Sequence, residues 1–191
     1  ATPLPKFQPR SAIDFGCGVG RLTLAMARHA KTVVGVDVSE RMLELAKERA
    51  NSTGVHNVEF HTDIPSTGVE WVNSLIVFQH IPPPRGLGLL EKLVSRLEAG
   101  GYLSVQLTFY RDAEHAHVVA ERIGDHRFDG RTLTAFDGLR PGQPGEMLMF
   151  DYDLNGVFRM LFASGLEQLW VEHTYHGGYH GVYLYGVKSA S

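Results

Sequence analysis

The chain has 191 residues, a formal net charge of −3 and one cysteine, so it predicts a single domain with a substantial core and excludes an intrachain disulfide. Acidic and basic residues are mixed along the sequence and form no basic stripe, which argues against a nucleic-acid partner. No apolar run approaches membrane-spanning length and the N-terminus lacks a secretory signal, so we expect a cytoplasmic protein with no membrane partner.

The stretch 11–37 predicts a strand, a glycine-rich turn, a helix and a second strand that ends in an acid. The apolar run 12–15 is too short for a helix and suits a buried strand. Glycines alternate with other residues over 16–20, where they permit positive φ and close approach of the main chain to a ligand. The second strand, 32–36, stops at Asp37, at the sheet edge where ligands of open α/β sheets bind. An acid at that place is well positioned to accept both hydroxyls of a ribose.

The glycine spacing separates two classes of cofactor site. Dinucleotide enzymes use G-x-G-x-x-G, with pyrophosphate on a helix N-terminus. Here the run from Asp14 to Gly20 is D-x-G-x-G-x-G, which resembles the first motif of class I S-adenosylmethionine-dependent methyltransferases. That cofactor has no phosphate, so the turn must admit a sulfonium-bearing methionyl tail, and an acid beside it suits a cationic ligand. The alternative is a βαβ unit whose glycines serve only a tight turn, which the correctly spaced Asp37 disfavours.

The next segment continues the same pattern. Ser39 predicts a helix N-cap, and Gly54 predicts the end of that helix. The strand 58–62 then leads into Asp63. The resemblance implies that an acid here takes the adenine amino group while an apolar neighbour packs on the ring, whereas the alternative is a turn aspartate, since aspartate is common in turns.

The run 71–78 is almost uniformly apolar and predicts a fourth strand that is covered on both faces. It leads into Gln79-His80-Ile81-Pro82, and many members of the resembled family carry such a phrase beside the transferable methyl group. Members often carry an aspartate at the start of this strand, where this chain has Val72-Asn73, so we expect no carboxylate catalyst there. His80 is the candidate general base because it follows the strand and histidine is a residue type suited to proton transfer near neutral pH. A histidine hydrogen-bonded in a proline-rich turn is an equal alternative.

A helix over 87–97 and a strand over 102–109 complete the family's core order, so the resemblance covers 11–109. The lead-in 1–10 predicts extended chain, and the glycine motif follows almost at once. Either the lid over the cofactor comes from elsewhere in this chain or an N-terminal lid is missing. The segment 110–150 is irregular and rich in Gly, Pro and Asp, which indicates a substrate loop or lid, or equally a mobile surface loop.

The C-terminal part predicts a helix over 154–162 and two strands, 167–175 and 179–187, joined by a Gly-Gly hairpin. A closing antiparallel hairpin separates class I methyltransferases from ordinary dinucleotide folds. The resemblance therefore implies a Rossmann-like α/β fold over 11–191: a seven-stranded mixed sheet, mainly parallel with an antiparallel last strand, and helices on both faces.

Histidines near this hairpin, together with Glu172, could suggest a metal site. On a two-residue hairpin His173 and Tyr175 share one face, while Glu172 and His176 lie on the other, because strand faces alternate. The histidines do not all converge, so no metal is expected. Cys17 is interpreted as a small packing residue of the glycine turn.

The resemblance implies an enzyme that binds S-adenosyl-L-methionine, releases S-adenosyl-L-homocysteine, and methylates oxygen or nitrogen of a small-molecule or glycan-type acceptor. Alternatives are a non-catalytic S-adenosylmethionine-binding module of the same fold and a nicotinamide-dependent oxidoreductase, which the glycine spacing disfavours. The residues expected to hold the cofactor are Asp14, Gly16, Cys17, Gly18, Gly20, Arg21, Asp37, Val38, Met42, Asp63, Ile64, Phe78 and Gln79.

Overall fold

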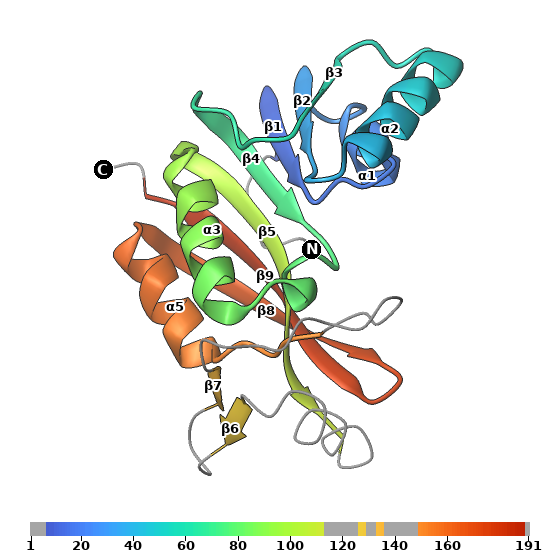
Figure 1. The fold of residues 1–191 in the computed structure, drawn as a ribbon. Helices are drawn as coiled ribbons and strands as arrows, with labels where there is room; N and C mark the ends of the chain where they lie inside the picture. The colour runs from blue at the N-terminus through green and yellow to red at the C-terminus, as the bar shows by residue number, and fades with distance from the viewer. Residues whose placement is uncertain (1–6, 113–125, 129–132, 136–148, 190–191) are drawn as a thin grey trace.

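The structure, a computed structural model, describes residues 7–112, 126–128, 133–135 and 149–189. Its centre is a seven-stranded sheet in the order β3-β2-β1-β4-β5-β9-β8 (Figure 1). The strands of this sheet are β1 Ser11–Phe15, β2 Thr32–Val36, β3 Val58–His61, β4 Val69–Ser74, β5 Leu97–Arg111, β8 Leu166–His176 and β9 Tyr179–Lys188. Two short strands, β6 His126–Phe128 and β7 Leu133–Ala135, pair separately.

Strand direction follows the expected class I pattern. The pairs from β3 through β5 are parallel, whereas β9 is antiparallel to both of its neighbours, β5 and β8. The prediction of a mixed sheet with a reversed last strand is therefore confirmed.

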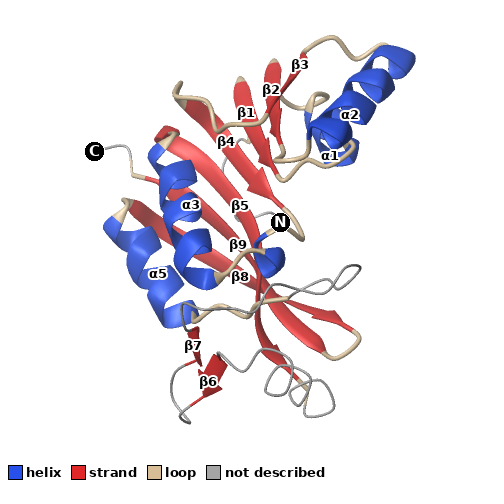
Figure 2. Ribbon diagram, in the orientation of Figure 1, coloured by secondary structure: helices blue, strands red, loops and turns tan. Residues whose placement is uncertain are grey.

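Helices cover both faces of the sheet (Figure 2). The helices are α1 Arg21–Met26, α2 Glu40–Thr53, α3 Pro83–Ser95 and α5 Leu154–Ala163, with a 3₁₀ turn, η1, at Phe78–His80. Neighbouring residues of β1 show the two sides, because side chains alternate along a strand. Ala12 packs in one cluster with Met26 of α1, while Ile13 packs in another with Leu90 of α3.

The start and end of α2 are where the sequence predicted them. The Ser39 side chain accepts a hydrogen bond from the backbone N–H of Met42 at 3.4 Å. Gly54 ends the helix in the left-handed region, with φ of 68°. Local capping chemistry therefore determines these bounds.

β4 ends earlier than the apolar run 71–78 predicts. The strand stops at Ser74, Ile76 has a φ of 59°, and Phe78 opens η1. Val77 packs on the glycine turn so closely that a Cβ on Gly16 would lie 2.2 Å from its Cγ2. The Phe78 ring, which is 0% exposed, lies within the core beside Phe15 and Tyr152, at centroid distances of 5.8 and 6.1 Å. The run is apolar because it folds back into the core.

The proline-rich segment after η1 starts a helix, four residues before the predicted range 87–97. α3 begins at Pro83, a first-turn position that tolerates proline because its missing N–H has no helical partner there. The Tyr152 hydroxyl donates to the Ile81 carbonyl at 2.7 Å, and a Cβ on Gly86 would lie 1.9 Å from that hydroxyl. Tyr152 thus fixes the start of α3, and Gly86 leaves the room for it.

The hairpin between β8 and β9 has the register of a two-residue turn, with His176 opposite Tyr179 and Tyr175 opposite His180. Its two glycines have positive φ, at 57° for Gly177 and 93° for Gly178, as the tight hairpin turn requires.

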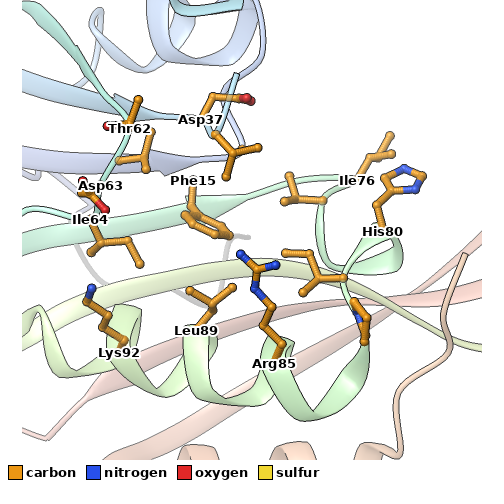
Figure 3. A pocket seen from close by; sticks show the side chains of 16 residues that line it. Phe15, Asp37, Thr62, Asp63, Ile64, Ile76, His80, Arg85, Leu89 and Lys92 are labelled. Carbon is orange, nitrogen blue, oxygen red and sulfur yellow. The ribbon is translucent and has the colours of Figure 1, made fainter. Parts of the chain in front are cut away.

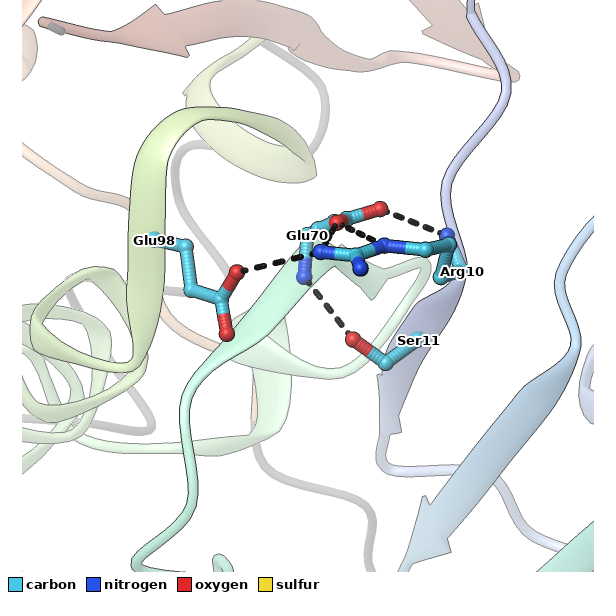
Figure 4. A network of polar contacts seen from close by, with 4 residues as sticks. All are labelled: Arg10, Ser11, Glu70 and Glu98. Carbon is cyan, nitrogen blue, oxygen red and sulfur yellow. Dashed lines mark hydrogen bonds and ion pairs between the residues drawn. The ribbon is translucent and has the colours of Figure 1, made fainter.

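An ion-pair network joins the segment before β1 to the start of β4 (Figure 4). The Arg10 guanidinium pairs with Glu70, and its side chain lies 4.0 Å from a carboxylate oxygen of Glu98. The Ser11 hydroxyl accepts from the Glu70 backbone N–H at 3.2 Å. The backbone N–H and the side chain of Arg10 also donate hydrogen bonds to the Glu70 carboxylate, and these bonds lower the pKa of Glu70. This network lies at the amino end of β1, away from the ends of the strands that form the site below.

Candidate cofactor site

A pocket of about 480 Å³ opens at the carboxyl ends of β1, β2 and β3. Figure 3 shows that side chains from two directions face each other across it. The strand wall includes residues that follow β1, β2 and β3: Gly16, Asp37, Val38, Thr62, Asp63 and Ile64. The helix wall comes from η1, α3 and the residues between them and includes His80, Arg85, Leu89 and Lys92. Phe15 and Val36 also line the pocket.

The glycine turn between β1 and α1 has left-handed backbone at each of its alternate glycines, with φ of 74° at Gly16, 52° at Gly18 and 74° at Gly20. The backbone N–H groups of Gly16 and Cys17 both donate to the Val36 carbonyl, at 2.7 and 3.0 Å. No atom lies within 4 Å of a Cβ built on Gly18. The turn is therefore tied to the end of β2, and the space toward which a Gly18 side chain would point is open.

Asp37 presents a fixed carboxylate at the end of β2. One oxygen accepts from the Gly18 N–H and the other from the Ser39 N–H, both at 2.9 Å. Each carboxylate oxygen has two lone pairs, so acceptor capacity remains on both. Paired ribose hydroxyls fit this arrangement, because the main chain already orients both oxygens.

Asp14, the first acid of the glycine motif, does not line the pocket. It is 2% exposed and accepts from the Thr23 hydroxyl at 2.6 Å and from the Asn73 amide at 3.0 Å. Asn73 in turn accepts from the Ser104 hydroxyl at 2.8 Å. Burial raises the pKa of the Asp14 carboxyl, and the hydrogen bonds from Thr23 and Asn73 oppose that shift. Asp14 and Asn73 therefore connect β1, α1 and β4 inside the protein.

Six of the residues predicted from the sequence meet at the pocket: Gly16, Asp37, Val38, Asp63, Ile64 and His80. Val38 is 82% exposed there. The predicted residues outside the lining are Asp14, Cys17, Gly18, Gly20, Arg21, Met42, Phe78 and Gln79. Among these, Gly20 packs against Ala46 and Phe60 of the core.

His80, the candidate base, lies in η1 and faces the pocket (Figure 3). Its Nε2 lies 3.2 Å from the Gln79 side-chain nitrogen. Its role as a base remains a prediction.

Cys17 is buried behind the glycine turn. Burial, followed by the nearby charges of Asp14 and Asp37, raises the pKa of its thiol to about 12. A thiol held in its neutral form is a poor nucleophile, which agrees with the packing interpretation.

The histidines of the hairpin do not form a metal cluster. His180 lies between its neighbours, with Nδ1 3.0 Å from His173 Nε2 and Nε2 2.8 Å from an Asp112 oxygen. Within the described ranges, no group of three or more His, Cys, Asp or Glu side chains could hold a metal ion.

The sequence interpretation missed the residues that α3 contributes. Arg85, Leu89 and Lys92 are spaced by four and three positions, so they lie on one face of the helix. Basic residues on the same helix face as a leucine were the available signal, although only the structure shows that this face meets the strand wall.

The predicted loop 110–150 lies mostly outside the described residues. In the described part of the chain, no helix is long and apolar enough to cross a membrane.

Comparison with known proteins agrees with the fold and the glycine motif. Residues 12–101 match the family model described as a methyltransferase domain. The chain is 32% identical over 137 residues to a trans-aconitate 2-methyltransferase of Sinorhizobium fredii, covering 68% of this chain and 52% of that protein. It is 35% identical over 121 residues to a 23S rRNA (uracil(1939)-C(5))-methyltransferase of Alcanivorax borkumensis, covering 59% of this chain and 27% of that protein. The chain thus spans about half the length of the trans-aconitate relatives that it matches.

Solved structures show the same fold. An S-adenosylmethionine-dependent methyltransferase of Methanosarcina mazei superposes with a TM-score of 0.69 at 17% identity, covering 98% of this chain and 96% of that one. Magnesium protoporphyrin IX methyltransferase of Synechocystis, solved with bound S-adenosylhomocysteine, gives a TM-score of 0.68 at 21% identity, covering 98% of this chain and 76% of that one. At these identities the likeness shows the fold.

Proposed function

We propose that this chain, which carries a class I S-adenosylmethionine-dependent methyltransferase domain, binds S-adenosyl-L-methionine in the pocket and methylates a small-molecule acceptor. The observation that carries the proposal is the pairing of the open glycine turn with the Asp37 carboxylate. The same turn that leaves space beside Gly18 also donates its N–H to Asp37 at 2.9 Å. One local structure therefore supplies both a path for a methionyl tail and a ribose acceptor.

The remainder of the strand wall suits the adenine. Val38 presents an exposed apolar side chain on one side, and Ile64 lies on the pocket lining beside Asp63. An adenine ring held between apolar groups, with its amino group donating to the Asp63 carboxylate, would cover Val38. This arrangement gives Asp63 a role beyond that of a turn residue.

When bound, S-adenosylmethionine supplies an electrophilic methyl group on a sulfonium. The chain's task is then to hold an acceptor in line with that methyl group, because alignment alone lowers such barriers by up to about 7–11 kcal/mol. His80 faces the pocket and is positioned to take a proton from a hydroxyl acceptor, a contribution of typically about 10²–10⁴-fold. An acceptor that is already ionised or arrives as a neutral amine needs only alignment.

A small-molecule acceptor is supported by two relatives that are named for trans-aconitate and match 68% and 63% of this chain. Glycan-type acceptors belong to the same proposal, with methylation on oxygen or nitrogen. An RNA acceptor is less well supported, because the rRNA methyltransferase matches less of this chain and the formal charge of −3 disfavours a polyanion.

Two titrations test the cofactor. S-adenosylhomocysteine should bind with a micromolar dissociation constant by calorimetry, while NADH should show no change in fluorescence. Binding of NADH without binding of S-adenosylhomocysteine would contradict the proposal and favour a nicotinamide enzyme.

A turnover assay then tests catalysis. S-adenosylmethionine is supplied with trans-aconitate, with neutral and acidic sugars, and with small amines, and release of S-adenosylhomocysteine is measured. Acceptor-dependent release identifies an enzyme. Tight cofactor binding with no release from any acceptor would indicate the non-catalytic module of the same fold.

A further inference from the structure

The pocket is divided by charge. Its strand wall carries the carboxylates of Asp37 and Asp63, whereas its helix wall carries the guanidinium of Arg85 and the ammonium of Lys92 (Figure 3). The acidic side suits a nucleoside cofactor that carries a net positive charge. The two side chains of the basic side are exposed and attract negatively charged groups.

Within the part of the chain that the structure describes, no hydrogen bond or ion pair holds the Arg85 guanidinium or the Lys92 ammonium. Two arginines elsewhere in the same part are paired, Arg10 with Glu70 and Arg111 with Asp151 at 2.7 Å. The charges on the helix wall are therefore available to a ligand.

Arg85 and Lys92 serve different ends of the pocket. They are seven residues apart on α3, which corresponds to about 10 Å along the helix axis. In Figure 3 Lys92 lies beneath Ile64, at the adenine end, whereas the Arg85 guanidinium extends toward Phe15, between Ile64 on one side and Ile76 on the other. Phe15 directly precedes Gly16 of the glycine turn, so Arg85 faces the end of the pocket where the methionyl tail and its methyl group belong.

We propose that Arg85 binds a carboxylate of the methyl acceptor, so that the substrate of this site is an acidic small molecule. A guanidinium presents a planar fork of N–H donors that matches a carboxylate with two parallel hydrogen bonds. An acceptor bound in this way lies between the cationic cofactor and Arg85, so its negative charge offsets the repulsion between them. The inference rests on the proposed function, since it names the acceptor class of that same pocket.

The test uses pairs of probes that differ in one kind of group. Protein saturated with S-adenosylhomocysteine is titrated by calorimetry with glucuronate and with glucose, and with propane-1,2,3-tricarboxylate and its triamide, at constant ionic strength. The wild-type protein should bind at least one carboxylate probe and prefer it to its neutral partner. Arg85→Gln should weaken that binding roughly 10–100-fold, and Arg85→Lys should weaken it less, because the charge remains but the fork is lost.

The matched control is Arg159→Gln, which removes the same charge from the exposed surface of α5. This variant should bind the carboxylate probes as the wild type does, and Arg85→Gln should keep the wild-type affinity for S-adenosylhomocysteine. The inference is overturned if no carboxylate probe is preferred, or if Arg85→Gln still prefers one. It is also overturned if Arg85→Gln weakens S-adenosylhomocysteine instead, since Arg85 would then belong to the cofactor. Failure of the wild type to bind S-adenosylhomocysteine contradicts the proposed function itself and is seen before any probe is added.

Discussion

The strand wall and the helix wall of the pocket are built in different ways. On the strand wall, main-chain N–H groups hold the Asp37 carboxylate, because Gly18 and Ser39 each donate to it at 2.9 Å. On the helix wall, long flexible side chains reach across from α3, and the position of that helix depends on the hydroxyl of Tyr152. The wall that we assign to an invariant cofactor is fixed by the backbone. The wall that we assign to the acceptor consists of side chains that single substitutions can change without disturbing the turn.

The first prediction concerns the reactivity of the Cys17 thiol, which is buried behind the glycine turn of the strand wall. Because the pKa of the Cys17 thiol is raised to about 12 from 9.0, its thiolate fraction near pH 8 should be roughly 1000-fold below that of a free thiol. Its reaction with a chromogenic disulfide reagent should be slow to a similar degree. The same protein in urea provides the reference rate. Equal rates in the folded and unfolded protein would mean that the glycine turn opens readily.

The second prediction removes the carboxylate of the strand wall. Asp37→Ala should lose two charge-assisted hydrogen bonds to the ribose, about 3 kcal/mol, and so bind S-adenosylhomocysteine roughly 100-fold more weakly. Glu48→Ala, which removes an exposed acid from α2, is the matched control and should bind normally. Unfolding midpoints of both variants are compared, because Asp37 also holds the N–H groups of Gly18 and Ser39. If Asp37→Ala is folded and binds S-adenosylhomocysteine with wild-type affinity, the assignment of Asp37 to the ribose hydroxyls is contradicted.

The third prediction tests the support of the helix wall. In Gly86→Ala the new Cβ would lie 1.9 Å from the Tyr152 hydroxyl, and Tyr152 is 1% exposed with little room to move. We expect a loss of about 1–3 kcal/mol in the free energy of unfolding, measured in urea. Gly88→Ala on the same helix has no atom within 4 Å of its Cβ and should be neutral or stabilising by up to about 1 kcal/mol. Equal stability of the two variants would show that Tyr152 does not fix α3.

The fourth prediction concerns the buried acid behind the strand wall. Burial raises the pKa of Asp14 above its ordinary value of 3.8, so the folded state holds that proton more tightly than the unfolded state does. The stability that Asp14 contributes is therefore fully present below pH 3.8 and decreases as pH rises through the folded pKa. Urea unfolding of the wild type and of Asp14→Asn is measured across this range. The free energy of unfolding of the wild type should decrease relative to that of the variant as pH rises. A difference in unfolding free energy that does not change with pH would contradict the assignment.

The sequence was informative wherever local chemistry decides the structure. The glycine turn, the Ser39 cap, the Gly54 stop and the Gly-Gly hairpin depend on residues close to one another in the chain, and the structure has each of them. It was less informative where distant segments meet. The early end of β4 depends on Val77 packing against Gly16, and the burial of Phe78 depends on Phe15 and Tyr152.

The residues of the pocket, too, could be predicted from the sequence only where they follow from a local motif or from strand order. Asp37, Asp63 and His80 could be placed from motif and order alone, because the carboxyl ends of parallel strands share one edge. Asp14 could not be separated from the pocket residues, since only the structure shows its bonds to Thr23 and Asn73. Arg85 could not be assigned to the pocket because no short motif tells which face of α3 meets the strand wall.

A crystal structure of the chain with S-adenosylhomocysteine tests the two-wall account most directly. We expect both ribose hydroxyls within hydrogen-bond distance of Asp37 and the adenine between Val38 and Ile64. We also expect the Arg85 guanidinium to face the acceptor side of the sulfur without touching the cofactor. An adenine stacked on Arg85, or a ribose away from Asp37, would contradict it.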